Sequence, residues 1–318
     1  MASTDTASTI EKVSMQTGTS VFHRNRRIFP LLMILPAILV TLIVILYPMG
    51  YSIYVSFTPY HLLRPDQTFV FEFDNMFRNY ERLWGDDIFW RSLRNTVIFL
   101  AVTVNLEFVF ALGLSQLIAR VSWGQSLIRT LLMVPMMFAP VLVGFQFAWF
   151  FNATVGLVNN ALLEIGILSE PKAWLINQPS GMITLMIASI WMNVPIMTII
   201  LLAGTLSLST EVYEAAEVDG ANAWQQFTRI TFPLLQPFTL IALTVRSLDV
   251  ARAYDIVRIM TGGGPAHRTE MIWTYAGRLA IRDSRFGLAS AMSMVGVFLG
   301  IVFTLYLFRQ LVKSRIVH

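Results

Sequence analysis

Residues 28–57 contain no charged side chain, and this uninterrupted apolar run constrains the fold more than any other feature of the sequence. A helix needs about 20 mostly apolar residues to cross the hydrocarbon core of a bilayer. Five further apolar runs reach that length: residues 95–119, 130–151, 182–208, 238–261 and 286–308. The sequence therefore predicts an all-α membrane protein with six transmembrane helices.

Composition excludes several kinds of site. Charged residues make up only 13% of the chain, against about 25% in typical soluble domains. The chain has no cysteine, and its four histidines lie too far apart in sequence to predict a metal site. No paired carboxylates lie within the apolar runs, which argues against an intramembrane enzyme. The basic residues flank the apolar runs and form no single patch, so the formal charge of +4 does not indicate nucleic-acid binding.

The polar tail, residues 1–27, is too long for a signal peptide and no cleavage pattern follows the first apolar run. We expect two parts, a cytoplasmic tail at 1–27 and a membrane domain at 28–318. Short loops rich in arginine and lysine face the cytoplasm. With six spans, three basic clusters fall on one side: Arg24, Arg26 and Arg27, then Arg120 and Arg129, then Arg309, Lys313 and Arg315. Both termini and residues 209–237 are therefore predicted to be cytoplasmic. Arg268, Arg278, Arg282 and Arg285 break this rule.

Residues 209–237 interrupt two apolar runs with a charged, helix-like insert. Ser209 or Thr210 can cap a first short helix, and Asp219 with Gly220 can end it, because glycine readily takes the left-handed conformation. Asn222 can then cap a second helix. Taken alone, this pattern fits either a solvated loop helix or a rigid mechanical part.

The spacing within the insert resembles a known signature. Glu214, Ala215 and Ala216 are followed after three residues by Gly220, and after nine more by the stretch 230–233, Ile-Thr-Phe-Pro. This order is similar to the EAA signature of permease subunits in bacterial ATP-binding-cassette importers, which prefers leucine where Phe232 stands. The resemblance implies a type I importer permease fold with a coupling helix that contacts an ATPase. The implied ATPase-coupling residues are Glu214, Ala215, Ala216, Asp219, Gly220, Ile230 and Pro233.

More of the chain resembles one branch of that family, the carbohydrate permeases related to the larger maltose-type (MalF-like) subunit. The stretch 261–270, TGGGPAHRTE, is similar to the glycine-rich external loop after the fifth span. The resemblance implies that this loop, with Gly262, Gly263, Gly264 and Pro265, faces an extracytoplasmic solute-binding protein. It also implies a second permease subunit in a heterodimer, two ATP-binding subunits, and a place in the bacterial inner membrane among its lipids. The chain has no phosphate-binding loop with its lysine, so we expect no cofactor in this chain, and ATP and Mg bound by the partner ATPases.

Charged residues recur every three positions at Arg246, Asp249, Arg252 and Asp255. Ionisable side chains in a membrane are costly and usually face a bundle interior or an aqueous cavity. One interpretation is pairing along a single helix. The other is that Arg246 and Asp249 border the translocation path, and the resemblance adds Ser189, Trp191 and Asn193 on the helix before the insert. Glu107 is interpreted as a polar contact between helices.

The cargo implied by the resemblance is a sugar, polyol or related glycoside, and Arg246 leaves an anionic glycoside open. An alternative is a secondary transporter driven by an ion gradient, for which Glu107 is the isolated carboxylate that could bind the ion. Under either interpretation, the chain itself is a transporter subunit and not an enzyme.

Overall fold

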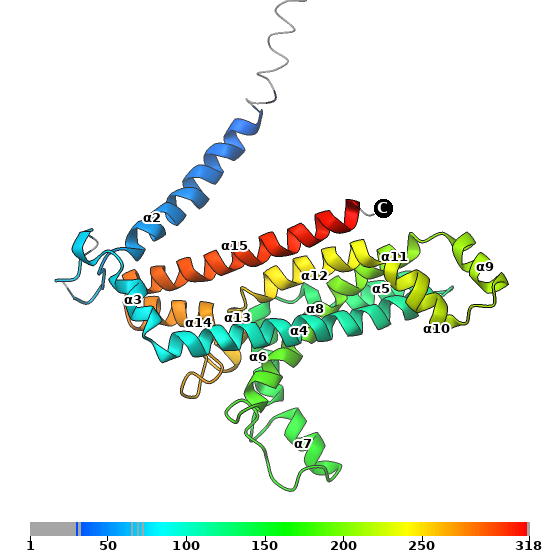
Figure 1. Ribbon diagram of the computed structural model, residues 1–318. Coiled ribbons are helices and arrows are strands. Elements are labelled where there is room, and N and C mark those ends of the chain that lie inside the picture. The colour runs from blue at the N-terminus through cyan, green and yellow to red at the C-terminus, as the bar shows by residue number, and fades with distance from the viewer. Residues whose placement is uncertain (1–29, 31–32, 65, 69, 72, 317–318) are drawn as a thin grey trace, which may run out of the picture. The chain divides into compact units, whose positions relative to one another are not determined.

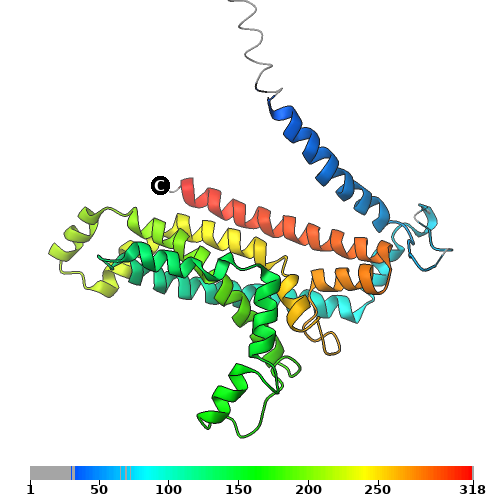
Figure 2. The ribbon, with the colours of Figure 1, turned by 180° about the vertical axis from the view of Figure 1, so that it is seen from behind.

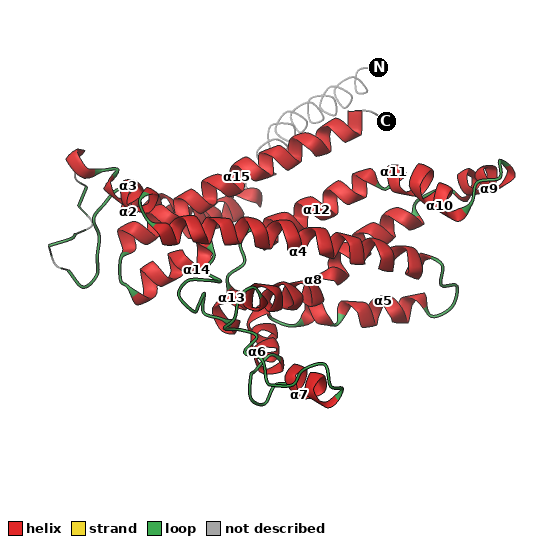
Figure 3. Ribbon diagram, turned by 60° about the horizontal axis from the view of Figure 1, so that its bottom comes forward, coloured by secondary structure: helices red, strands yellow, loops and turns green. Residues whose placement is uncertain are grey.

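The computed structural model describes residues 30, 33–64, 66–68, 70–71 and 73–316 (Figure 1). It divides into two units, Met1–Val55 and Ser56–His318. Every regular element in the described residues is a helix (Figure 3). The first elements along the chain are η1 Leu42–Leu46, α2 Tyr47–Ser56, η2 Phe73–Asn75, α3 Arg78–Trp84, α4 Asp87–Ala119, α5 Gln125–Met133, η3 Pro135–Met137, α6 Pro140–Phe150 and α7 Leu157–Glu164. They are followed by α8 Ser180–Leu206, α9 Thr210–Val218, α10 Ala223–Gln226, η4 Phe227–Thr231, α11 Phe232–Leu234, α12 Gln236–Val250, α13 Asp255–Met260, α14 Ile272–Gly277, η5 Arg278–Arg282 and α15 Phe286–Ile316.

The first unit contains a long apolar helix. Met33–Ser56 is long and apolar enough to cross a membrane, as predicted for the run 28–57. A helix that is hydrophobic all round needs lipid or another protein chain as its surroundings. The predicted cytoplasmic tail, residues 1–27, lies outside the described residues, so its boundary stays a prediction.

Three of the other predicted spans are also confirmed as long apolar helices: Asp87–Ala119, Ser180–Leu206 and Phe286–Gln310. The remaining two are bent pairs. Gln125–Met137 meets Pro140–Phe150 at 87°, and Ala223–Leu234 meets Gln236–Val250 at 63°. The described residues thus hold four candidate spans, or up to six if each bent pair crosses the membrane once. The count of six stays a prediction.

The run 238–261, predicted as one span, is not a single helix. Helix α12 ends at Val250, and the chain begins a separate short helix, α13, at Asp255. Helix α13 packs against α6. The charges of Arg252 and Asp255 therefore lie beyond the apolar helix, where the chain does not have to bury them in hydrocarbon.

Helices α4, α8 and α12 form the core of the second unit. Helix α4 lies along α8, and α12 contacts α8, α4 and α15. Small side chains stand at these contacts, and Ala111, Ala188 and Ala242 are fully buried. In a membrane, close packing of small residues replaces much of the hydrophobic drive for helix association. The buried face of α4 repeats every four residues and includes Phe99, Thr103, Glu107, Ala111 and Ser115.

The two ends of α4 carry different parts of the chain. Helices α9 and α10 lie at one end of the second unit, while α3, α14 and the start of α15 lie at the other (Figures 1 and 2). Between the ends, the bend at α6 leads to the short helix α7, Leu157–Glu164. Asn159 holds this segment, since its Oδ1 accepts from Nε1 of Trp174 at 2.7 Å and its Nδ2 donates to the carbonyl of Ala153 at 2.8 Å.

Candidate functional site

The insert at 209–237 is a helical hairpin with defined ends. Helix α9 has Asp219 as its C-terminal cap, and the next residue, Gly220, has φ = +76°. Asn222 caps α10 through a capping box, in which its side chain accepts from the backbone N–H of Gln225 and Gln225 accepts in return. The predicted left-handed glycine and the predicted asparagine cap are both confirmed. Ser209 occupies the first cap position, but its side chain makes no capping hydrogen bond.

Two contacts hold the hairpin closed. The hydroxyls of Tyr213 on α9 and Thr231 at the end of η4 lie 2.9 Å apart. The backbone N–H of Ala221 donates to the carbonyl of Ala216 at 2.9 Å across the turn. The first contact joins α9 to the returning limb, and the second closes the turn between the two short helices.

The outer surface of the hairpin is exposed. Glu214 and Ala215 are exposed on α9, while Ile230 is half-buried and Pro233 is exposed on the return. Two large apolar side chains beside them are strongly exposed, Val218 at 89% and Trp224 at 71%. Exposed apolar groups of this size are typical of a surface that contacts another protein or a membrane.

Four of the five predicted path residues meet at one cavity. Ser189, Asn193, Arg246 and Asp249 line a cavity of about 100 Å³ between α8 and α12. Trp191 does not line it, and its ring lies 5.5 Å from that of Phe147. Ligand pockets usually have volumes of roughly 300–1,000 Å³. This chain therefore does not by itself enclose a sugar at that cavity.

Arg246 is the centre of a charged network beside the cavity. Its Nε donates to Oε2 of Glu107 on α4 at 2.8 Å, and its Nη2 donates to Oε1 of Glu107 at 3.0 Å. Its Nη1 also pairs with Asp249 one turn along α12. The side chains of Glu107 and Arg246 are 0% and 3% exposed, whereas that of Asp249 is 57% exposed. Arg246 and Asp249 thus pair along one helix and also line the cavity, so both interpretations hold for them. The interpretation of Glu107 as a polar contact between helices is confirmed.

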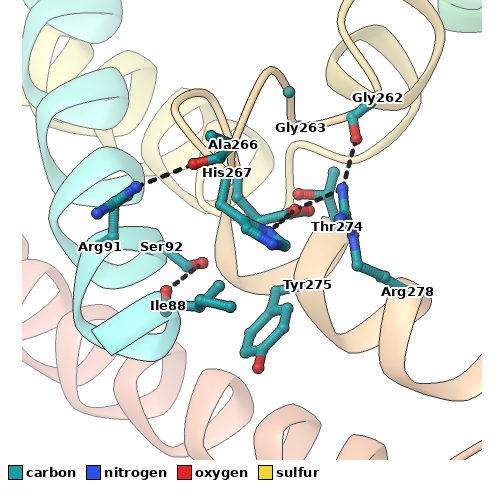
Figure 4. Close-up of polar contacts among 12 residues, drawn as sticks. Ile88, Arg91, Ser92, Gly262, Gly263, Ala266, His267, Thr274, Tyr275 and Arg278 are labelled. Atoms are coloured by element: carbon teal, nitrogen blue, oxygen red, sulfur yellow. Dashed lines mark hydrogen bonds and ion pairs between the residues drawn. The ribbon is translucent and has the colours of Figure 1, made fainter. Parts of the chain in front are cut away.

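The glycine-rich loop closes over a buried carboxylate. Glu270 is fully buried, and its Oε2 lies 2.9 Å from Nη2 of Arg278 and 3.0 Å from Nδ1 of His267. Nη2 of Arg278 also donates to the carbonyl of Gly262 at 3.0 Å (Figure 4). Gly263 is buried above the carboxylate with φ = +81°, and a Cβ there would lie 2.5 Å from Oε1 of Glu270. The loop has this shape because a charged group fills the space beneath it.

Helix α4 anchors the same loop from its other side. Nη1 of Arg91 donates to the carbonyl of Ala266 at 2.9 Å (Figure 4). Nδ2 of Asn95 donates to the carbonyls of Arg268 and Glu270 at 3.0 and 2.9 Å. Pro265 and Ala266 at the tip stay exposed. The loop is therefore a firmly held surface at the end of α4 that is remote from the insert.

Comparison with known proteins places these features in a family. Residues 108–318 match the model of the binding-protein-dependent transport system inner membrane component. The match covers more than half of the chain and includes both the insert and the glycine-rich loop.

The chain belongs to that family.

Relatives and solved structures agree with this assignment. The permease is 32% identical over 275 residues to the trehalose/maltose transport system permease protein MalF of Thermococcus litoralis, covering 86% of this chain and 90% of the relative. Its fold matches a chain of a bacterial ABC transporter involved in the import of the acidic polysaccharide alginate, with a TM-score of 0.78 at 24% identity, over 92% of this chain and 99% of that one. A second alginate transporter structure, in complex with an alginate pentasaccharide-bound periplasmic protein, matches with a TM-score of 0.76 at 23% identity, over 89% and 93% of the two chains. The type I importer permease fold expected from the sequence is thus confirmed.

Several residues that organise this permease were not predicted as site residues. Glu270, Arg278 and Asn95 shape the glycine-rich loop, yet they are distributed over two distant segments. The one available signal was that Glu270 ends the stretch 261–270, where an acid directly precedes an apolar helix. The pairing of Glu107 with Arg246 was also not predicted, because no sequence feature near either residue indicates its partner.

Replacing Gly263 with alanine should disorganise the loop. The new Cβ would lie 2.5 Å from the Glu270 carboxylate, and a non-glycine residue at φ = +81° is strained, which together cost about 1–3 kcal/mol or more. We expect a lower thermal unfolding midpoint for the purified permease. Gly264→Ala is the matched control, because its Cβ would meet nothing closer than 3.5 Å. Equal midpoints for the two variants would contradict the proposed role of Glu270 beneath the loop.

Proposed function

We propose that this permease carries a sugar, polyol or related glycoside across the bacterial inner membrane, with ATP hydrolysed by partner subunits. The observation that supports the cargo most directly is the 32% identity to a trehalose/maltose permease over most of both chains. The cavity chemistry fits this class, since Ser189 and Asn193 offer hydroxyl and amide groups and Asp249 offers a carboxylate. Because the fold is similar to that of a permease from an alginate importer, the proposed cargo class includes an anionic glycoside.

The hairpin of α9 and α10 is proposed as the part that contacts an ATPase. Its exposed acidic and small side chains at Glu214 and Ala215 would meet the ATPase surface, and Val218 would add apolar contact. Ala216, Asp219 and Gly220 would keep the turn closed, while Ile230 and Pro233 would connect it to α12. ATP and Mg would be bound by the partners, and this chain would supply no catalytic group.

The proposed assembly has two permease subunits, two ATP-binding subunits and an extracytoplasmic solute-binding protein. Both termini and the insert would be cytoplasmic. The loop with Gly262, Gly263, Gly264 and Pro265 would then face the binding protein, because it lies at the end of α4 remote from the insert (Figure 1). Its firm anchoring suits a docking surface that must keep its shape between encounters.

An ion-driven secondary transporter has little support. Its ion would need a carboxylate that can exchange a proton or cation within the membrane. Glu107 was the candidate for this role, but both of its oxygens are taken by the guanidinium group of Arg246. A carboxylate held by two charge-assisted hydrogen bonds is poorly suited to release and rebind an ion.

The function is tested by purifying the permease with its partners from its native membrane and measuring ATP hydrolysis. We expect ATPase activity that rises when a solute-binding protein loaded with a sugar is added. Uptake in whole cells should continue with an uncoupler present while ATP is maintained. A permease that purifies without an ATPase, or uptake that collapses with the ion gradient, would overturn the proposal.

Asp249→Ala should reduce uptake severalfold while leaving the complex assembled. The exposed carboxylate of Asp249 borders the cavity. Its removal leaves Arg246 paired with Glu107, so the buried guanidinium group stays neutralised. Initial rates of uptake and co-purification of the ATPase would be measured together. Glu164→Ala, an exposed acid on α7 away from the cavity, serves as the control. Unchanged uptake by Asp249→Ala would limit Asp249 to a structural role.

A further inference from the structure

A second and larger polar pocket lies at the end of the second unit that is remote from the insert. It has a volume of about 550 Å³ and lies between the loop after α2, helix α3 and the start of α15. Three arginines from these three segments line it: Arg64 on the loop, Arg82 on α3 and Arg285 just before α15. Residues far apart in sequence therefore bring three guanidinium groups to one cavity.

The three arginines of this pocket are exposed, and they form no ion pair with the described residues. None of the three guanidinium groups has a carboxylate within 4.0 Å among the described residues. The acid among the described lining residues, Asp86, accepts hydrogen bonds from the backbone N–H of Ile88 at 2.9 Å and from the hydroxyl of Tyr275. One carboxylate thus faces three permanently charged side chains.

Local electrostatics agree with this charge imbalance. Partial burial and the guanidinium groups of Arg78, Arg285 and Arg64 lower the pKa of Arg82 from its ordinary value. Burial and the hydrogen bond to Asp86 raise the pKa of Tyr275, which keeps its hydroxyl protonated as a donor. Arginine stays charged at physiological pH, so an anion bound among the three groups would reduce their mutual repulsion.

The surroundings of the pocket have two features that are typical of a membrane interface. Helices α4 and α15, both candidate spans, line it near their first residues, with Ile88 and Leu288. The indole rings of Trp84 and Trp90, which are 69% and 41% exposed, lie at the same end of α4. Tryptophan is enriched where lipid headgroups meet water. These features are what a pocket at headgroup level would show, and Arg285 is one of the arginines that break the charge rule for short loops.

We propose that this pocket binds the phosphate group of a phospholipid headgroup in the leaflet remote from the insert. The planar fork of arginine matches phosphate oxygens with paired hydrogen bonds, and three such groups provide more donors than one phosphate needs. His61 adds a further donor, because its Nδ1 accepts from the backbone N–H of Leu63 and its Nε2 therefore carries the proton. The bound lipid would connect the loop after α2 with α3 and α15.

The test compares lipids that differ only in the phosphate. The transporter complex is purified, delipidated and heated with either phosphatidylglycerol or diacylglycerol of the same chains. We expect phosphatidylglycerol alone to raise the unfolding midpoint of the wild type, because ligands that bind the folded state stabilise it. The double variant Arg82→Gln with Arg285→Gln should lose this rise. The matched control is Arg94→Gln with Arg268→Gln, which removes the same charge from two exposed arginines that do not line the pocket. This control should keep the rise in unfolding midpoint.

Each other outcome decides against the proposal. An equal rise with diacylglycerol would show that the acyl chains bind elsewhere. An equal rise with inorganic phosphate would assign the pocket to a free anion. Loss of affinity for the solute-binding protein with unchanged lipid response would make the pocket a protein contact. If the glutamine variant does not fold, Arg82→Lys with Arg285→Lys replaces it, because lysine keeps the charge but lacks the planar guanidinium group. This variant should retain less phospholipid than the wild type, as measured by native mass spectrometry. Retention equal to the wild type would overturn the proposal.

Discussion

Arg246→Met should destabilise this permease by about 3–5 kcal/mol, the usual cost of removing one partner of a buried ion pair. The variant would leave the carboxylate of Glu107, which is 0% exposed, without the two hydrogen bonds that it accepts. Methionine fills much of the same volume, so the loss would come from the unpaired charge and not from a cavity. Chemical unfolding of the purified permease, followed by tryptophan fluorescence, measures the difference.

The double variant Glu107→Leu with Arg246→Met is the matched control. Replacing a whole buried ion pair by apolar side chains is often neutral or stabilising. We therefore expect the double variant to regain most of the stability that the single variant loses. A single variant as stable as the wild type would mean that the pair contributes nothing to holding α4 against α12.

Gly220→Val should abolish coupling between ATP hydrolysis and transport, if the hairpin contacts the ATPase as proposed. Gly220 has φ = +76°, and a β-branched residue is strongly disfavoured there. No atom lies within 4 Å of the position that a Cβ would occupy, so the effect would come from the backbone and not from a steric clash. The turn that joins Ala216 and Ala221 would open, while the membrane helices would insert normally.

Gly220→Asn is the control for this substitution, because asparagine tolerates the left-handed conformation. It should keep most of the stimulation of ATPase activity by the loaded binding protein, whereas Gly220→Val should lose it. Membrane content of both variants would be compared by immunoblotting. Normal sugar uptake by Gly220→Val would exclude a role for the turn in coupling.

The insert could be predicted in detail because its structure is local. The left-handed turn at Gly220 and the cap at Asn222 follow from residue types within a few positions of one another, and both are confirmed. The long apolar helices are also confirmed, since about 20 apolar residues have few alternatives to a membrane span. These elements depend mainly on residue types within one short segment, which a sequence shows directly.

The charged core could not be predicted in the same way. Glu107 and Arg246 are 139 residues apart, and nothing near either residue identifies the other. The spacing of Arg246, Asp249, Arg252 and Asp255 suggested one helix, but α12 ends at Val250. The chain then turns into α13, which packs against α6, and a contact between such distant segments has no local sequence pattern. The family resemblance implied Trp191 at the path, but Trp191 does not line the cavity and its side chain packs against Phe147.

The pairing of Glu107 with Arg246 also constrains how the sequence of this permease can diverge. Loss of either residue alone leaves a buried charge, so selection should remove single replacements before the second can arise. Descendant lineages should therefore keep both residues or lack both, and intermediates with one should be rare. Within this one family, positions 107 and 246 should co-vary more strongly than the exposed Asp249 does with Arg246, because water can take the place of an exposed partner.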